Sequence, residues 1–107
     1  MNKVRLTPEA INDLMELKAY IADKLQNPLA AEGTVSRIMQ SIRILHHHAE
    51  AGPSVEATTG YKTELHFLVC GNYIAIYRID GKTVSIARVF NGRQDYLRIL
   101  FGNAAQI

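Results

Sequence analysis

Hydrophobic residues recur at helical spacing through the first half of the chain and alternate with polar residues through much of the second half. Residues 3–6 alternate and predict a short strand, with Val4 and Leu6 on its buried side. Thr7-Pro8 then predicts a helix start, because threonine caps helix ends and proline suits the first helical turn. Residues 8–25 carry one apolar stripe, made of Ala10, Ile11, Leu14, Leu17, Ile21 and Leu25. The polar residues between them are predicted to face water: Asp13, Glu16, Lys18 and Asp23.

The dipeptide Asn27-Pro28 repeats this start signal and predicts a second helix. Its apolar stripe is again a single narrow line, made of Ala31, Val35, Ile38, Ile42 and Leu45. Gly33 is expected to weaken this helix slightly and to allow a close packing contact. Because only two or three residues separate the helices, we expect an antiparallel helical hairpin.

From Tyr61 the hydrophobic period falls from about 3.6 residues to about two, which is typical of strands. A strand over residues 61–69 would place Lys62, Glu64 and His66 on one face. Its other face would carry Tyr61, Thr63, Leu65, Phe67 and Val69. Gly71-Asn72 and Asp80-Gly81 predict tight turns, the second of type I′, and they separate two further strands over residues 73–79 and 83–90. Residues 93–101 predict a short helix.

These elements place the chain in the α+β class as a single domain over residues 1–107. The predicted architecture is an N-terminal strand, an antiparallel helical hairpin packed on a three- to four-stranded antiparallel sheet, and a short C-terminal helix. Residues 49–60 are predicted to be a linker. Because the hairpin covers one sheet face, the opposite face, with Lys62, Glu64 and His66, needs another cover or a function.

The formal charge of the chain is only +2, but it is unevenly distributed. Residues 1–56 hold six Lys and Arg against seven Asp and Glu, while residues 57–107 hold six against three. The second half therefore has enough positive charge for a basic working surface, and a basic tail is excluded. Neither a membrane span nor a secretory signal is present in the pattern, so we expect a cytoplasmic protein without a membrane partner.

Cys70 is the only cysteine, which excludes an intrachain disulfide and a cysteine-based zinc site and favours a reducing compartment. We expect it to be a small buried hydrophobic residue rather than a nucleophile. The run His46-His47-His48 lacks the i, i+4 spacing that chelation on a helix requires, and it is interpreted as a helix C-terminus. Neither a metal nor another cofactor is expected.

Lys62, Glu64 and His66 form the first candidate site. At spacings of two along a strand their side chains would converge on one patch. A base, an acid and a cation in that arrangement suit RNA cleavage, where the 2′-hydroxyl loses a proton, the leaving oxygen gains one and the phosphorane is stabilised. A solvent-facing strand of an ordinary α+β domain would give the same pattern.

The second candidate site is the segment 88–96, where Arg88 and Arg93 bracket the turn Asn91-Gly92. Guanidinium groups are preferred partners of phosphate oxygens, and Tyr96 has a ring that stacks on bases. The structural alternative is that Arg88 pairs with a nearby carboxylate and Tyr96 belongs to the core.

In the order of its elements and motifs, the chain resembles the RelE/ParE superfamily of bacterial toxins, which belong to type II toxin–antitoxin or plasmid-stabilisation modules. The resemblance spans residues 3–101. Four stretches carry it: Leu6-Thr7-Pro8-Glu9-Ala10 with Asp13-Leu14; Tyr20-Ile21 with Asn27-Pro28 and Ala30-Ala31; Gly71 to Ile79; and Val84 through Arg88-Val89 to Gly92-Arg93-Gln94-Asp95-Tyr96.

The resemblance implies a growth-inhibiting toxin neutralised by a cognate antitoxin protein. Its target would be DNA gyrase for a ParE-like member, or ribosome-bound mRNA for a RelE-like, metal-independent endoribonuclease. A degenerate, non-toxic antitoxin-binding module is the third possibility. For a nuclease, the implied catalytic residues are Lys62, Glu64, His66, Arg93 and Tyr96. Glu64 and Ile74, however, stand where RelE-like nucleases commonly have Lys and Arg, and the segment 88–95 is closer to ParE-like sequences. The implied contacts to nucleic acid or another target are Arg78, Arg88, Arg93 and Arg98.

Overall fold

Two capped helices form the hairpin that supports the sheet. Helix α1 spans Pro8–Leu25 and helix α2 spans Pro28–Ile42. The side chain of Thr7 accepts a hydrogen bond from the Ala10 N–H at 3.1 Å, and that of Asn27 accepts one from the Ala30 N–H at 3.3 Å. Each helix also begins with proline, so both predicted starts are confirmed.

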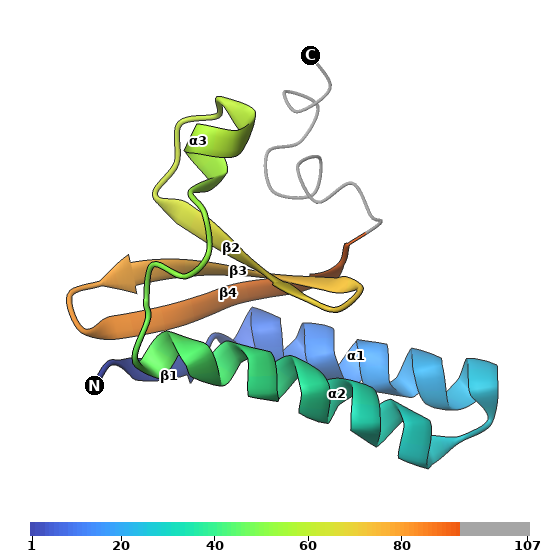
Figure 1. Ribbon diagram of the computed structural model, residues 1–107. Coiled ribbons are helices and arrows are strands. Elements are labelled where there is room, and N and C mark those ends of the chain that lie inside the picture. Colours follow the sequence, from blue (N-terminus) through green and yellow to red (C-terminus); the bar gives the residue numbers. More distant parts are fainter. Residues whose placement is uncertain (93–107) are drawn as a thin grey trace.

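The computed structural model describes residues 1–92, and within them the hairpin covers one face of a four-stranded sheet (Figure 1). The strands are β1 (Lys3–Leu6), β2 (Leu65–Cys70), β3 (Tyr73–Asp80) and β4 (Thr83–Asn91), in the spatial order β1-β4-β3-β2. A 3₁₀ turn, η1 (Arg43–His46), continues α2, and a short helix, α3 (Val55–Thr59), lies on the other side of the sheet (Figure 1). The α+β class is confirmed; the predicted C-terminal helix over 93–101 lies outside the described residues.

The sheet is mixed rather than antiparallel as predicted. Strand β1 pairs in parallel with β4, with Val4 opposite Val84 and Leu6 opposite Ile86, whereas β2, β3 and β4 form an antiparallel meander. A parallel pair needs a long crossover connection, and the helices and the first two meander strands supply it. The Thr7 hydroxyl also donates to the Ala87 carbonyl at 2.9 Å, so the α1 cap is fixed to β4 just beyond β1.

The segment predicted as a linker, residues 49–60, is structured. Ser54 caps α3 by accepting the Ala57 N–H at 3.3 Å. Just before α3, the Pro53 carbonyl accepts the Phe67 N–H at 3.1 Å, and Ser54 forms an isolated antiparallel bridge with His66. This segment therefore shields part of the outer edge of β2, which would otherwise present unpaired backbone groups.

The predicted alternation of the first meander strand has the wrong phase. Strand β2 begins at Leu65, four residues later than expected, and it is Leu68 and Cys70 that contribute to the core beneath the sheet. Val69, predicted to be buried, is 61% exposed. The error arises because β2 carries apolar residues on both faces, so alternation alone does not show which face meets the helices.

The main core lies between the hairpin and the sheet, and α1, α2, η1 and the three meander strands all contribute to it. Its buried members are Ala10, Leu14, Ile38, Ile42, Leu45, Cys70, Ala75, Tyr77, Val84, Ile86 and Val89. The stripe predicted for α2 is confirmed through Ile38 and Ile42. The stripe predicted for α1 is wrong at Ile11 and Leu25, which are exposed. Within residues 1–92, no helix is long and apolar enough to cross a membrane.

The turn between β3 and β4 is one residue later than predicted. Asp80 is the last residue of β3 and Thr83 the first of β4, so the two turn residues are Gly81 and Lys82. Gly81 has a φ of +63°, and Lys82 is not among the described residues of positive φ. A positive φ at the first turn position alone suits a type II′ turn, not the predicted type I′.

Replacing Gly33 with alanine is expected to stabilise the protein by about 0.5–1 kcal/mol, because glycine is a poor helix former. The predicted close packing at Gly33 is wrong: an added Cβ would meet only the Arg37 Nη1 atom, at 3.5 Å. The free energy of unfolding in urea measures the gain. A loss of stability in this variant would contradict the assignment of open space at this position.

Candidate functional site

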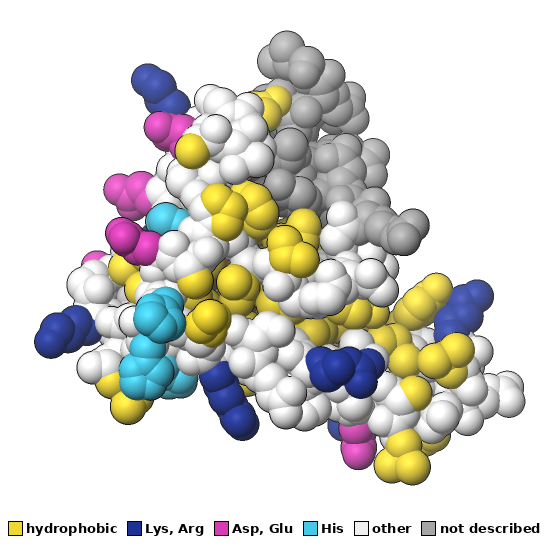
Figure 2. Space-filling model, in the orientation of Figure 1, with side chains coloured by type: hydrophobic (Ala, Val, Ile, Leu, Met, Phe, Trp, Pro, Cys, Tyr) yellow, Lys and Arg dark blue, Asp and Glu magenta, His cyan; other side chains and the backbone are white. Residues whose placement is uncertain are grey.

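The sheet face turned away from the hairpin, called here the α3 face, holds two of the predicted target-binding residues, Arg78 and Arg88. Strand alternation and register place an apolar centre on it, made of Leu65, Phe67, Ile74, Ile76 and Phe90. Figure 2 shows hydrophobic side chains gathered between α3 and the hairpin, with charged side chains towards the periphery. Ile76 and Phe90 are buried and the other members of this centre are partly buried, so the polar and charged side chains around it, carboxylates as well as cations, are the groups available to a macromolecule.

The prediction that Lys62, Glu64 and His66 share one strand is wrong. Lys62 and Glu64 are exposed and precede β2, in a segment where Glu56 accepts the Thr63 N–H at 3.1 Å. Only His66 lies in the strand, and its ring stacks on Tyr77 with the ring centroids 5.3 Å apart. Because Tyr77 belongs to the core beneath the sheet, His66 faces the hairpin side. Strand periodicity therefore does not bring these three residues together.

Tyr77 and His66 hold the loop that leads to α3. The buried Tyr77 hydroxyl donates to the Ala49 carbonyl at 2.8 Å and accepts the Gly52 N–H at 2.9 Å. The His66 Nδ1 lies 3.0 Å from the Gly52 carbonyl, a geometry in which its N–H donates. Burial raises the pKa of Tyr77, and its bond to the Gly52 backbone opposes that rise. The phenol is therefore a structural hydrogen-bonding group.

Tyr77→Phe is expected to lower the free energy of unfolding by about 1–3 kcal/mol, because it leaves buried backbone groups of Ala49 and Gly52 without a partner. Urea unfolding at neutral pH measures the loss. Tyr73→Phe is the matched control, since the Tyr73 hydroxyl makes no hydrogen bond within the described part of the chain. Equal losses in both variants would contradict this role for Tyr77.

Arg88 makes the best-defined ion pair of the described residues. Its Nε and Nη2 atoms donate to the Asp13 carboxylate at 2.8 and 3.0 Å, and the Val89 N–H donates to the same carboxylate at 2.9 Å. The guanidinium carbon also lies 4.8 Å from the centre of the Phe90 ring. The hydrogen bond to Asp13 raises the pKa of Arg88, and partial burial opposes the rise. The structural alternative from the sequence, a pairing with a carboxylate, is confirmed.

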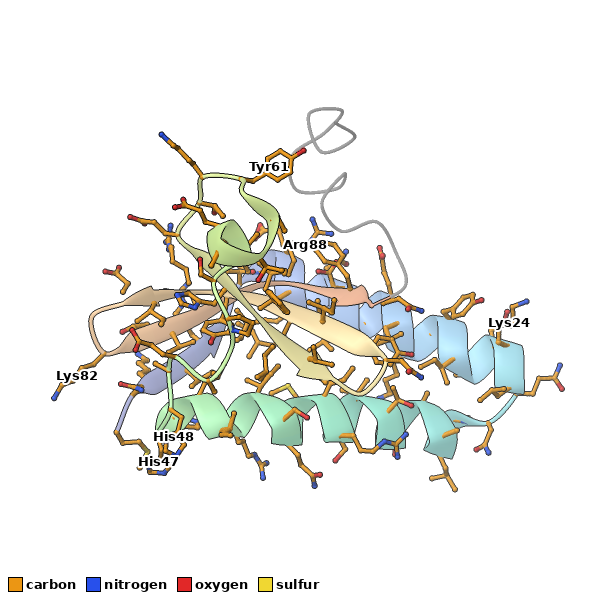
Figure 3. The ribbon with its side chains drawn as sticks, turned by 45° about the horizontal axis from the view of Figure 1, so that its top comes forward. Lys24, His47, His48, Tyr61, Lys82 and Arg88 are labelled. Atoms are coloured by element: carbon orange, nitrogen blue, oxygen red, sulfur yellow. The ribbon has the colours of Figure 1, made fainter. Side chains whose placement is uncertain are left out.

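The Arg88–Asp13 pair borders a cavity of about 520 Å³ between α1 and the end of β4. The cavity is lined by Leu17, Tyr20, Tyr73, Val89 and Phe90, with Glu16 and Asn91 contributing polar groups. Arg88 lies at this end of the sheet (Figure 3). The Arg88 side chain remains 34% exposed, so it has surface left for a further contact.

The other predicted site residues divide into exposed and undescribed ones. Arg78 is exposed on the α3 face of β3. Arg93, Tyr96 and Arg98 lie outside the described residues, so the structure leaves their roles as predictions.

The side chains considered for metal or thiol chemistry have structural surroundings. Cys70 is buried, and burial raises the pKa of its thiol while a hydrogen bond with Ser41 opposes the rise. A thiol in that state is a poor nucleophile, as predicted. The His46 imidazole has a structural partner, because its Nδ1 lies 2.9 Å from the Asn2 carbonyl oxygen. His47 and His48 follow η1 (Figure 3), and no metal-binding group of three ligand side chains occurs within residues 1–92.

Sequence reasoning missed Asp13 and Gly52. Asp13 was predicted to face water, but its side chain is only 11% exposed, because its helix position flanks the buried Leu14. The available signal was Arg88, because an arginine within a half-buried strand indicates that a carboxylate elsewhere in the chain is shielded as its partner. Nothing in the sequence indicated that position 52 requires glycine, because the requirement comes from contacts with Phe67 and Tyr77, which lie later in the chain.

The arrangement of strand, helical hairpin and three-stranded meander has the element order expected for the RelE/ParE superfamily. The sequence model of a family described as the ParE toxin of the type II toxin–antitoxin system parDE matches residues 4–96. The chain belongs to this family, within the RelE/ParE superfamily that the sequence resembles.

Eleven chains of solved structures match the fold, and two of them come from toxin–antitoxin systems. A chain of the chromosomal ParDE toxin–antitoxin system from Pseudomonas aeruginosa superposes with a TM-score of 0.72 at 22% identity, covering 85% of this chain and 96% of that one. A chain of the toxin–antitoxin complex RelBE2 from Mycobacterium tuberculosis gives a TM-score of 0.60 at 22% identity, covering 84% and 96%. No curated protein matches the sequence.

Proposed function

We propose that this chain is a cytoplasmic toxin that arrests bacterial growth by inhibiting DNA gyrase and is neutralised by an antitoxin protein. Membership of the ParE toxin family supports the toxin role, and the similar structures come from a ParDE system and a RelBE2 toxin–antitoxin complex. The exposed Arg78 and the partly exposed Arg88, together with Arg93 and Arg98 beyond the described residues, are the proposed contacts to the target.

The surroundings of His66 are the observation that favours gyrase inhibition over mRNA cleavage. A nuclease of this design needs an acid, a base and a cation around one phosphate. Here His66 is stacked on the buried Tyr77 and bonded to the Gly52 carbonyl, while Lys62 and Glu64 belong to the segment before the strand. We therefore assign a catalytic role only if transcripts prove to be cut, and it would then fall to Lys62, Glu64, His66, Arg93 and Tyr96.

The test is to induce the chain alone in a bacterial host and to follow growth, transcript integrity and DNA cleavage in parallel. We expect growth arrest, intact transcripts, and purified gyrase that loses supercoiling activity or accumulates cleaved DNA. The double variant Lys62→Ala/Glu64→Gln should remain toxic, because both side chains are exposed and outside the sheet. Co-expression of the antitoxin should restore growth.

Three results would overturn the proposal in different ways. Ribosome-dependent cuts in transcripts, abolished by Lys62→Ala/Glu64→Gln, would assign the RelE-like activity instead. Continued growth with a stable, antitoxin-bound protein would assign a non-toxic binding module. Arrest with intact transcripts and fully active gyrase would exclude both targets.

A further inference from the structure

The register of the mixed sheet brings together three polar residues that are far apart in the sequence. Arg5 of β1 is paired with Ser85 of β4, and Ser85 is paired with Arg78 of β3. Their neighbours Val4, Leu6, Val84, Ile86, Tyr77 and Ile79 all contribute to the core beneath the sheet. Since side chains alternate across a sheet, Arg5, Ser85 and Arg78 project together from the α3 face.

Both arginines of this row are exposed, and within residues 1–92 neither has an ion-pair or hydrogen-bond partner for its side chain. Adjacent strands lie about 4.8 Å apart, so the Arg5 and Arg78 backbones are separated by roughly 10 Å with Ser85 midway. Two long side chains on such a base are able to converge above the hydroxyl. Arg88 lacks this freedom, because Asp13 holds it through two hydrogen bonds.

The charge around the row is mixed, since the exposed Glu64 precedes Leu65, the residue paired with Arg78. Lys3 lies two residues before Arg5 on the same face of β1, and Lys82 is exposed in the turn at the same end of the sheet (Figure 3). The opposing charge on the same face of β3 is Asp80, two residues beyond Arg78, and it forms no ion pair within the described residues. The sequence pattern had indicated Arg78 but not Arg5 or Ser85.

We propose that Arg5, Ser85 and Arg78 form a binding site for the phosphodiester backbone of a nucleic acid. Two guanidiniums and a hydroxyl suit phosphate oxygens, which guanidinium groups bind through paired hydrogen bonds. The Asp13 carboxylate takes one arginine together with the Val89 N–H, whereas a nucleic-acid strand carries a phosphate at every nucleotide and so offers a separate anionic group to each arginine of the row. The row therefore favours phosphate over an acidic segment of a protein partner. This inference does not depend on gyrase being the target.

Fluorescence anisotropy of the purified full chain with labelled oligothymidylate and oligouridylate, over a range of salt concentrations, tests the site. Arg5→Gln/Arg78→Gln should weaken binding about tenfold or more and reduce the slope of log affinity against log salt by about 1.4, the value for two lost single-strand phosphate contacts. Ser85→Ala should weaken binding by about two- to threefold, as loss of one hydrogen bond implies. Asp80→Asn should strengthen binding by a similar factor, since it removes a neighbouring negative charge.

Arg43→Gln is the control that removes one positive charge away from the row, because Arg43 is exposed on η1, a segment joined to the hairpin rather than on the α3 face. It should change the affinity by less than about twofold, in line with screening at a distance. Circular dichroism checks that each variant is folded, and Arg5→Lys keeps the charge if Arg5→Gln does not fold. Equal losses in Arg43→Gln and the double variant, no measurable binding, or equally strong competition by polyglutamate of matched charge would overturn the proposal.

Discussion

Gly52→Ala is expected to lower the free energy of unfolding by about 3 kcal/mol or more, because an added Cβ would meet its neighbours more closely here than at any other described glycine. An added Cβ would overlap the Phe67 carbonyl oxygen and lie 2.8 Å from the Tyr77 hydroxyl oxygen. The carbonyl belongs to β2, which is paired with β3, so it is unable to move aside without breaking the sheet. Such a loss is a large part of the roughly 5–15 kcal/mol that stabilises a typical domain.

The structural consequence follows from what Gly52 contacts. Its N–H donates to Tyr77 and its carbonyl accepts from His66, so displacing the loop removes hydrogen bonds from both rings. We expect the variant to unfold at lower urea concentration and to accumulate poorly in cells. Gly33→Ala is the matched control, being the same chemical change with the opposite expected sign. A Gly52→Ala variant as stable as the wild type would show that the loop does not lie against β2.

The helical hairpin was predictable because its signals are local. Thr7-Pro8 and Asn27-Pro28 determine the helix starts through contacts within one turn, and the spacing of Ile38 and Ile42 identifies the buried side of α2. Such short-range features depend only on residues that are close together in the sequence, so they can be predicted from it. The family resemblance had the same basis, since it depended on motifs in order along the chain.

The sheet was less predictable because its decisive contacts are between distant residues. Strands β2 to β4 are apolar on both faces, so neither the phase of β2 nor the cover provided by α3 follows from alternation. The parallel pairing of β1 with β4 joins residues about as far apart as the domain allows. For the same reason the row of Arg5, Ser85 and Arg78 is visible only once the register is known.

Within the candidate site, Arg88 shows most clearly which features the sequence predicts and which it does not. Its residue type indicated an anionic partner, and two interpretations, phosphate and carboxylate, remained open at the sequence level. The partner, Asp13, lies 75 positions earlier on α1. Because Asp13 also accepts the Val89 N–H, one carboxylate fixes both the arginine and the backbone of β4. The structural role of Arg88 therefore has to be separated experimentally from any role in target binding.

A double-mutant cycle on Asp13 and Arg88 is expected to give a coupling energy of about 1.5–3 kcal/mol, the range for a charge-assisted, partly buried pair. Both single changes should destabilise the fold: Arg88→Ala leaves a carboxylate that is only 11% exposed without its cation, and Asp13→Ala also removes the acceptor of the Val89 N–H. Lys18 and Glu32, 3.9 Å apart with side chains 51% and 62% exposed, provide the control cycle. Their coupling should be no more than about 0.5 kcal/mol and should vanish in high salt, whereas the Asp13–Arg88 coupling should persist.

The same variants separate structure from function when growth arrest is measured beside stability. Loss of the pair in either variant loosens β4 from α1, but only Arg88→Ala removes the guanidinium itself. If Arg88 contacts the target, Arg88→Ala should relieve growth arrest more than Asp13→Ala does at equal levels of folded protein. If both variants relieve arrest only in proportion to their loss of stability, Arg88 acts as a clamp between α1 and β4, and target binding must be assigned to other cations such as Arg78.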